Sequence, residues 1–321
     1  MAETRYFSLA RHALAEALGA IGIQSGDRVA LPEFICRDVL SSIHHLGAQV
    51  IYYPVDESLM PIRFPSELEI KAIIAVNYFG FAQQLEPFFE YCRISSAVLI
   101  EDNAHGFLSS DENGSMLGTR APFGITSIRK TIRIADGASL SINDQIYLDR
   151  VSPQLPSKSH KEMRPSIIRL FATIDKQFHL PILRIMRTLA RQSRKIRTGA
   201  ALPVSNPGSE YEPLTISAPY KSSLRVLARL NTKKEQARRQ HLYRALEIAL
   251  GNLPLRPVYP SLPTGTIPYG YPFFSDDKTA KLAGKITRRF GVEIIKWPDL
   301  PSSIEHGAPL HYKNVWLINF L

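Results

Sequence analysis

The sequence has few cysteines and no long apolar run. Two cysteines, Cys36 and Cys92, occur in 321 residues, and their number and spacing provide neither a disulfide framework nor a zinc-binding pattern. No apolar stretch approaches the length of a transmembrane helix, and charged residues interrupt the N-terminal stretch where a signal peptide would have a continuous apolar core. We therefore expect a cytoplasmic protein that is neither secreted nor integral to a membrane.

Motifs for common nucleic-acid and dinucleotide partners are also missing. The sequence contains no Gly-x-Gly-x-x-Gly pattern, no internal repeat and no zinc-finger or RNA-binding signature, and its basic residues are not interleaved with aromatic ones. Basic residues nevertheless outnumber acidic ones, and the formal net charge is +10. This charge favours an anionic partner, for which a phosphorylated ligand, a nucleic acid and a membrane surface are all candidates.

Composition and periodicity predict an α/β enzyme. With 45% hydrophobic and 21% charged residues, the chain is large enough for a substantial core and a second, smaller domain. Strand patterns occur at 28–31, 49–53, 72–76 and 97–100, and helical patterns at 9–23 and 36–45. The alternation of strand and helix predicts a mainly parallel sheet with right-handed crossovers, covered by helices on both faces.

The second half of the sequence predicts a small C-terminal α/β domain. A stretch rich in Pro, Ser and Gly at 199–219 is typical of a connector, and one long amphipathic helix is expected at 221–250. Strand patterns at 266–274, 292–295 and 315–320 surround a helical pattern at 277–290. We therefore predict a large domain over residues 1–220 and a small domain over residues 221–321.

The residues suited to catalysis or ligand binding are concentrated between Ser96 and Leu140. An apolar run ends there in Glu101 and Asp102, at the carboxyl end of a predicted parallel strand, and this is the edge where open α/β sheets bind ligands. His105 follows, and Lys130 comes after a second apolar run. Asp102, His105 and Lys130 are therefore the candidate functional residues.

The same stretch resembles a known family. The segments EDNAH and SIRKTIRIADGA are similar to the Glu-Asp-x-Ala-His/Gln and Ser/Phe-x-x-Lys segments of the fold-type I pyridoxal-phosphate enzymes, most closely the DegT-type nucleotide-sugar aminotransferases. Two upstream segments, SGDRVALPEFICRDVLSSIHHLGAQVIYYPVD at 25–56 and VNYFGFAQQLEPFFEYC at 76–92, resemble that family's preceding strand and helix units. Taken in order, these segments cover most of the first half of the chain.

The resemblance implies a cofactor, pyridoxal 5'-phosphate, and assigns roles to the central residues. Lys130 would carry the cofactor covalently and then move protons, while Asp102 would keep the ring nitrogen protonated. Ser127, three residues before the lysine, is implied as a further cofactor contact. His105 would contact the ring hydroxyl or the ring face, and a structural histidine bonded to the backbone is the alternative.

Two positions depart from the family's pattern. At the start of the first helix the family has a glycine-containing segment that holds the cofactor phosphate, whereas this sequence has Ser8-Leu9-Ala10-Arg11. Arg11 would supply positive charge there, or it is an ordinary solvated residue. The family's aromatic ring over the cofactor aligns with Cys36, and Phe34, two residues earlier, would either stack on the cofactor or pack in the core.

The activity implied by the resemblance is transfer of an amino group, from glutamate, onto a keto sugar linked to a nucleotide. A homodimer with active sites at the subunit interface is implied as well. One alternative is a degenerate member that keeps the fold as a binding or scaffold protein, which the missing glycine and the short ends favour. Another is a basic nucleic-acid or membrane-surface protein. The retained Lys130 argues against the family's dehydratase branch, where histidine replaces the lysine.

The strongest basic cluster lies at residues 184–197. Its basic residues mingle with apolar ones, so a surface helix with its apolar side inward is one interpretation. Contact with a nucleotide diphosphate and adsorption to anionic lipid are the others. We expect no nucleic-acid binding from this cluster.

Overall fold

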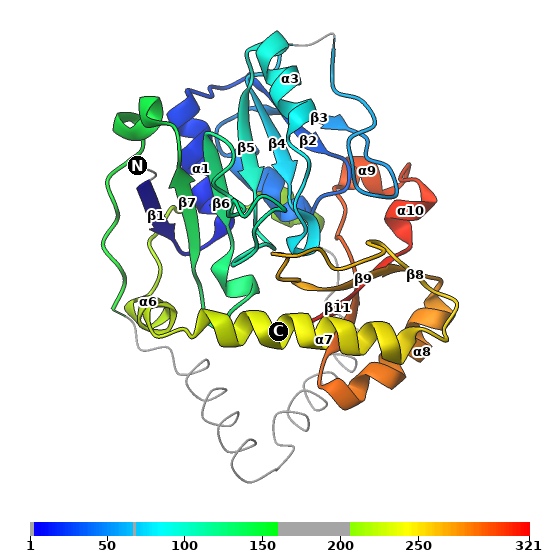
Figure 1. Ribbon diagram of the computed structural model, residues 1–321. Coiled ribbons are helices and arrows are strands. Elements are labelled where there is room, and N and C mark those ends of the chain that lie inside the picture. The colour runs from blue at the N-terminus through cyan, green and yellow to red at the C-terminus, as the bar shows by residue number, and fades with distance from the viewer. Residues whose placement is uncertain (1–2, 67–68, 160–205) are drawn as a thin grey trace.

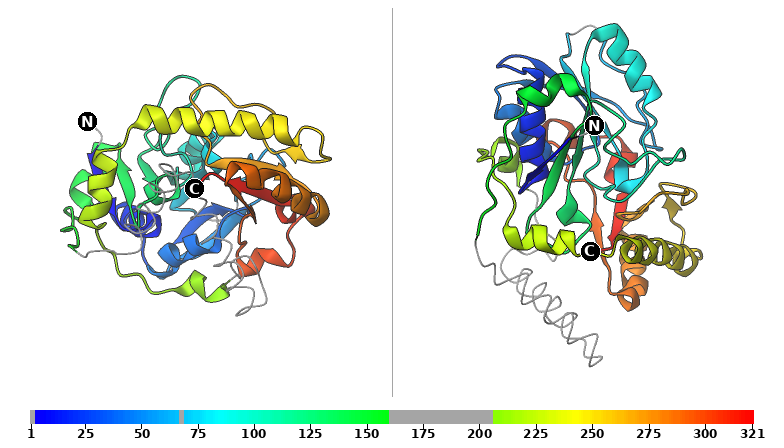
Figure 2. Two further views of the ribbon diagram at one scale, coloured as in Figure 1. Left: turned by 90° about the horizontal axis from the view of Figure 1, so that it is seen from below. Right: turned by 60° about the vertical axis from the view of Figure 1, so that its left-hand side comes forward.

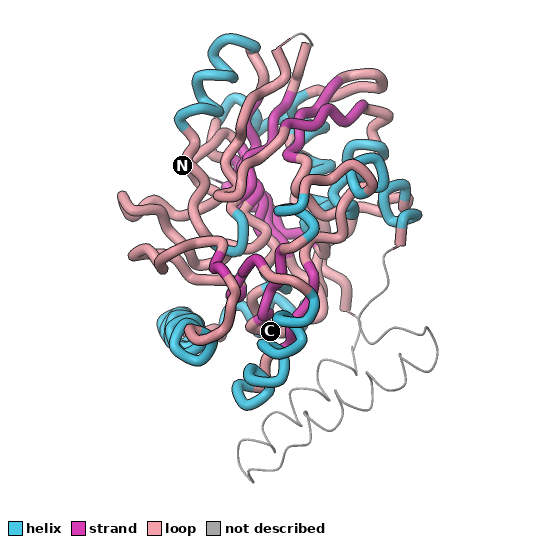
Figure 3. The backbone as a smooth tube through the Cα atoms, turned by 90° about the vertical axis from the view of Figure 1, so that its right-hand side faces the viewer, coloured by secondary structure: helices cyan, strands magenta, loops and turns pink. Residues whose placement is uncertain are grey.

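Two sheets organise the protein. The computed structural model describes residues 3–66, 69–159 and 206–321 (Figure 1). Within these residues a seven-stranded sheet forms the larger layer, and a four-stranded sheet lies in the second half of the chain. The strands run through the middle of the molecule, and helices and loops surround them (Figure 3).

The large sheet is mainly parallel, as the alternation of apolar runs predicts. Its order is β1-β7-β6-β5-β4-β2-β3. The strands are β1 (Glu3–Phe7), β2 (Arg28–Pro32), β3 (Gln49–Tyr53), β4 (Ala72–Val76), β5 (Val98–Asp102), β6 (Phe123–Thr126) and β7 (Ala138–Ile142). Neighbours from β3 through β6 pair in parallel, whereas β7 is antiparallel to both β6 and β1. The predicted α/β fold is therefore confirmed, and the antiparallel edge formed by β1 and β7 is an addition to it.

Helices cover both faces of the large sheet. The helix α1 (Ala10–Ile21) and the helix α3 (Glu86–Ser95) lie on opposite sides of it (Figure 2). The short η1 (Arg37–Val39) and α2 (Leu40–His44) replace the single helix expected at 36–45. Strand β4 is buried at all five positions, because apolar side chains meet a helical layer on each face.

The second sheet is antiparallel throughout, with the order β10-β11-β9-β8. Its strands are β8 (Arg256–Pro257), β9 (Gly270–Phe274), β10 (Glu293–Lys296) and β11 (Val315–Asn319). The helices of this half are α6 (Lys221–Ala228), α7 (Thr232–Leu250), α8 (Asp277–Thr287), α9 (Ser302–Glu305) and α10 (Leu310–Lys313). The small α/β unit matches the sequence expectation, while the domain division between residues 220 and 221 stays a prediction.

The helix expected at 221–250 is interrupted, so that prediction is wrong in detail. Asn231 lies between α6 and α7 in an extended conformation, and its side-chain oxygen accepts a 2.9 Å hydrogen bond from the backbone amide of Lys234. Asparagine at a helix N-cap satisfies an amide that would otherwise lack a partner. The chain therefore starts a new helix at Thr232 and does not continue the first one.

A close backbone approach joins the two sheets. Gly80, in the turn after β4, has φ +92°, and a Cβ atom there would lie 2.6 Å from the carbonyl oxygen of Ile267. The amide of Tyr269 donates a 2.7 Å hydrogen bond to the carbonyl oxygen of Phe79. Only glycine permits this approach, so the start of β9 lies directly against the carboxyl edge of the large sheet.

Two further expectations concern the basic cluster and membrane association. The basic cluster at 184–197 lies outside the described residues. Among the helices that are described, none combines the length and the apolar character needed to cross a membrane.

We predict that Gly80→Ala destabilises the protein by at least about 3 kcal/mol, because both the positive φ and the contact with Ile267 oppose a side chain. Gly22→Ala is the matched control, since Gly22 has φ +89° but no atom within 4 Å of a Cβ. The control should cost only about 1–2 kcal/mol of backbone strain. Urea unfolding of both variants measures the difference, and equal losses would contradict the role of the close approach.

Candidate functional site

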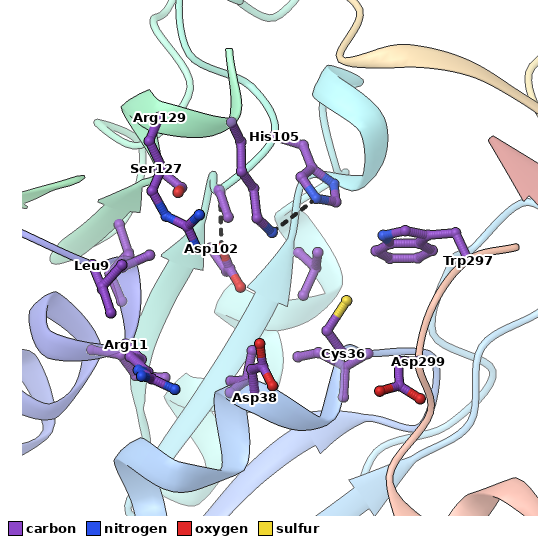
Figure 4. Close-up of a pocket in the computed structure, with 18 of the residues that line it drawn as sticks. Leu9, Arg11, Cys36, Asp38, Asp102, His105, Ser127, Arg129, Trp297 and Asp299 are labelled. Atoms are coloured by element: carbon purple, nitrogen blue, oxygen red, sulfur yellow. Dashed lines mark hydrogen bonds between the residues drawn. The ribbon is translucent and has the colours of Figure 1, made fainter. Parts of the chain in front are cut away.

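A cavity of about 620 Å³ opens at the carboxyl ends of β4 and β5 (Figure 4). Five of the six residues singled out in the sequence line it: Arg11, Asp102, His105, Ser127 and Lys130. They come from the start of α1, the end of β5, and the turns that follow β5 and β6. The sheet therefore gathers at one edge residues that are far apart in the sequence.

Asp102 is the last residue of β5 and is 9% exposed. Its Oδ1 accepts a 2.9 Å hydrogen bond from the amide of Ala104. Burial raises the pKa of the Asp102 carboxyl, and the Ala104 hydrogen bond and the positive charge of Lys130 oppose that shift only in part. A buried carboxylate of this kind is stabilised by a cationic group bound beside it.

Lys130 lies at the end of η3 (Ile128–Lys130), the turn that follows β6, and reaches across to His105. The Nζ of Lys130 is 3.1 Å from Nε2 of His105. The imidazole stacks on the ring of Tyr269, with centroids 4.4 Å apart and an interplanar angle of 3°. Burial, and secondly the charge of Lys130, hold the pKa of His105 well below its usual range, so the ring is neutral at pH 7.

The backbone determines which nitrogen of His105 carries the proton. The amide of Phe79 donates to Nδ1 of His105 over 3.4 Å, so in the neutral ring the hydrogen resides on Nε2. The same nitrogen lies beside Nζ of Lys130. The local network therefore places a neutral imidazole directly against the lysine amine.

Unsatisfied donors collect at the α1 end of the cavity. Ser127 is 1% exposed, and its hydroxyl has no hydrogen-bond partner among the described residues. The helix α1 begins at Ala10 without a side-chain cap, so its first amides are available to a ligand. Arg11 forms a 2.7 Å ion pair with Glu212, while its buried Nε lacks a described partner. Such an arrangement of amides, hydroxyl and guanidinium is suited to an anion.

Cys36, Asp38, Trp297 and Asp299 also line the cavity. Trp297 and Asp299 lie on the side away from Arg11, and Asp38 lies between Arg11 and Cys36 (Figure 4). Burial raises the pKa of the Cys36 thiol to about 11, so the thiol is neutral and not an activated nucleophile. Phe34 does not line the cavity. It is fully buried, and its ring contacts those of Tyr78, Trp297 and Tyr312, in agreement with the core-packing interpretation.

Tyr269 and Trp297 also line the cavity, and neither was among the residues expected from the sequence. Both lie in the second half of the chain, more than a hundred residues from Lys130, and no local motif marks their chemistry. Among the described residues, no cluster of His, Cys, Asp and Glu is arranged to hold a metal ion. The aromatic part of the site therefore becomes visible only in the folded structure.

We predict that Asp102→Asn stabilises the cofactor-free protein at pH 8 by about 1 kcal/mol, because a buried charge is removed while the Ala104 hydrogen bond is kept. Because the pKa of Asp102 is raised in the folded protein, the protonated side chain contributes to folding stability at low pH. This contribution is lost as pH rises through the folded-state pKa. The advantage of asparagine should therefore grow from pH 4 to pH 8.

Asp136→Asn is the control for this comparison. Asp136 is also buried with a raised pKa, but its two oxygens accept from the Tyr220 amide and the Ser223 hydroxyl. Asparagine should not stabilise that site. Thermal unfolding from pH 4 to pH 8 tests both variants. If the stability gained by Asp102→Asn stays constant or shrinks as pH rises, the carboxylate of Asp102 is not destabilised by burial.

Comparison with known proteins agrees with the resemblance seen in the sequence. Residues 7–156 match the sequence model of the DegT/DnrJ/EryC1/StrS aminotransferase family. The GDP-perosamine synthase of Escherichia coli O157:H7 is 30% identical over 145 residues, which is 43% of this chain and 40% of that protein. The chain thus covers less than half the length of this relative.

Solved structures of low sequence identity share the fold. The aminotransferase TlmJ from Streptoalloteichus hindustanus is 17% identical, with a TM-score of 0.62 over 98% of this chain and 80% of that one. A GDP-4-keto-6-deoxy-D-mannose-3-dehydratase of E. coli with bound hydrated PLP is 13% identical, with a TM-score of 0.58 over 98% and 82%. Residues 7–156 are therefore similar in sequence to the DegT/DnrJ/EryC1/StrS aminotransferase family, and the solved structures share the fold.

Proposed function

We propose that the protein is a pyridoxal-phosphate aminotransferase that transfers an amino group to a keto sugar linked to a nucleotide. The observation that carries this proposal is the meeting of three groups in one cavity: Asp102, Lys130 and the hydroxyl of Ser127, which has no hydrogen-bond partner among the described residues. Each of the three matches a different part of the cofactor.

The residues present fit pyridoxal 5'-phosphate. The Ser127 hydroxyl, the start of α1 and Arg11 would hold the phosphate, because they supply donors and positive charge. Asp102 would bind the protonated ring nitrogen, an ion pair that relieves the cost of its buried charge. When bound, the cofactor supplies an electron sink for carbanion chemistry at the substrate's amino carbon.

Lys130 would attach the cofactor and transfer protons, and His105 would orient the lysine amine. Lys130 Nζ would hold the cofactor covalently, and the same amine would take and return a proton during transfer. His105 is neutral at pH 7 and orients that amine through Nε2. The stack on Tyr269 restricts the imidazole to one plane. The active site thus depends on a fixed imidazole and a mobile amine.

The relatives support the substrate class. The names GDP-perosamine synthase and GDP-4-keto-6-deoxy-D-mannose-3-dehydratase both refer to GDP-linked sugars. In this chain Trp297 and the carboxylates of Asp38 and Asp299 line the cavity. Aromatic faces and carboxylates suit a polyhydroxylated ring, since one covers C–H groups and the others accept from hydroxyls. Glutamate as amino donor, a cytoplasmic location and a homodimer remain part of the proposal.

A scaffold or binding role is the second candidate, and Cys36 favours it. The position where the family carries a ring over the cofactor has a cysteine here, so one face of the cofactor would lack that stacking partner. An absorbance spectrum of the purified protein with added pyridoxal phosphate separates the two candidates. An enzyme should show a visible band that borohydride removes, and a scaffold should not.

We predict that Lys130→Ala abolishes covalent attachment of the cofactor and lowers transamination by at least about a thousandfold, because both the linking amine and the proton carrier are lost. Lys71→Ala is the control, since Lys71 is 41% exposed and pairs with Asp27 away from the cavity. Borohydride reduction followed by peptide mass spectrometry locates the modified lysine. Modification at any other lysine in the wild-type protein would contradict the assignment.

The homodimer is tested separately by sedimentation. We expect a dimer at micromolar concentration when the cofactor is bound, because fold-type I enzymes complete each site with residues of the partner. A cofactor-loaded protein that sediments only as a monomer would contradict this part of the proposal.

A further inference from the structure

Arg239 is a fully buried arginine in α7 whose bonds lead to the active site. Its side chain is 0% exposed and forms a 2.8 Å ion pair with Glu235, one turn earlier in the same helix. The other guanidinium nitrogens donate to three backbone carbonyls: Pro268 at 3.1 Å, Tyr269 at 3.1 Å and Thr131 at 2.6 Å. In Figure 1, α7 runs below the large sheet and alongside β9.

These carbonyls belong to the backbones that support the Lys130 and His105 pair. Thr131 is the residue directly after Lys130. Tyr269 supplies the ring that stacks on His105. One guanidinium therefore binds the chain that carries the amine and the chain that holds the imidazole in place, although these segments are more than a hundred residues apart.

The guanidinium is suited to such a role because its geometry is rigid. Its planar fork directs each N–H along a fixed line, so the carbonyls of Thr131 and Tyr269 are held in a set relative position. Burial lowers the pKa of Arg239 to about 10, and the group stays charged at neutral pH. A charge removed from water is costly unless all its donors are satisfied, which makes any displacement of these two segments unfavourable.

We propose that Arg239 is a positioning residue that sets the separation between Lys130 Nζ and His105 Nε2. The inference rests on the proposed function of Lys130, but the geometry it describes exists in the cofactor-free protein. The neighbouring Arg238 provides a contrast. It is 46% exposed and also pairs with Glu235, but its further hydrogen bond goes to the carbonyl of Phe320.

The test measures the reactivity of Lys130 in the cofactor-free protein. The wild-type protein, Arg239→Met, Arg239→Lys and Arg238→Met are treated briefly with trinitrobenzenesulfonate, and mass spectrometry gives the labelling rate of Lys130 relative to the exposed Lys281. Labelling depends on how the turn after β6 presents the amine, and Arg239 holds that turn through the carbonyl of Thr131. We expect Arg239→Met to slow relative labelling about tenfold, because a small misplacement of a reacting group lowers its rate by at least that order.

The two other variants separate positioning from stability. Arg238→Met should label like the wild type, and Arg239→Lys should recover part of the rate because an ammonium still reaches some of the carbonyls. Wild-type labelling in folded Arg239→Met would overturn the inference, even if its melting temperature falls. If Arg239→Met does not fold, Arg239→Lys decides: slower labelling supports positioning, and an unchanged rate overturns it.

The labelling result distinguishes failure of the Arg239 inference from failure of the proposed aminotransferase function. A protein that never binds pyridoxal phosphate would still show the labelling difference if Arg239 positions the pair. In a loaded enzyme the same displacement should lower kcat with little change in KM, because the carbonyls that Arg239 binds belong to the segments that carry Lys130 and Tyr269. A change confined to KM would count against the inference.

Discussion

A buried ion pair next to Asp102 is the interaction on which the site depends. Glu101 is 0% exposed, and its carboxylate accepts from Arg120 at 2.6 Å and from Asn77 at 2.8 Å. Successive residues of a strand point to opposite faces of a sheet, so Glu101 and Asp102 meet different environments. Glu101 is paired with a guanidinium, whereas within the described part of the chain Asp102 has a single donor, the amide of Ala104. Of two adjacent carboxylates, one stabilises the sheet edge and the other is left for a ligand.

Two buried guanidinium groups join backbone segments around the cavity. Arg37, next to Cys36, lies 3.3 Å from Glu210 and 3.0 Å from Glu305, so it ties the turn after β2 to segments far along the chain. Arg239 performs the corresponding task below the Lys130 turn. Each group is costly to bury alone and is stable only with its full set of partners. The backbone segments around the cavity are therefore held in place, because these buried charges are stable only while all their partners stay bound.

The sequence predicts the parts of this site that are local. Apolar runs mark β2, β4 and β5, and Asp102 follows from its position at a strand end. Lys130 is indicated by its place after a second apolar run and by the family resemblance. The contact between Lys130 and His105 requires the parallel pairing of β5 and β6, which periodicity alone does not specify. Tyr269 and Arg239 reach the site by tertiary packing, so no neighbouring residue reveals them. The break at Asn231 was readable in principle, since asparagine before a polar helical run is a known cap.

Charged groups of both signs line the cavity, and their partners constrain what it accepts. Arg11 pairs with Glu212, and both line the cavity. The carboxylate of Asp299 lies 3.2 Å from Nε of Arg37, so it is paired as well. Asp102 is buried and accepts one side-chain hydrogen bond among the described residues, from the amide of Ala104. Of these carboxylates, Asp102 is therefore the one that a bound cationic group would stabilise most.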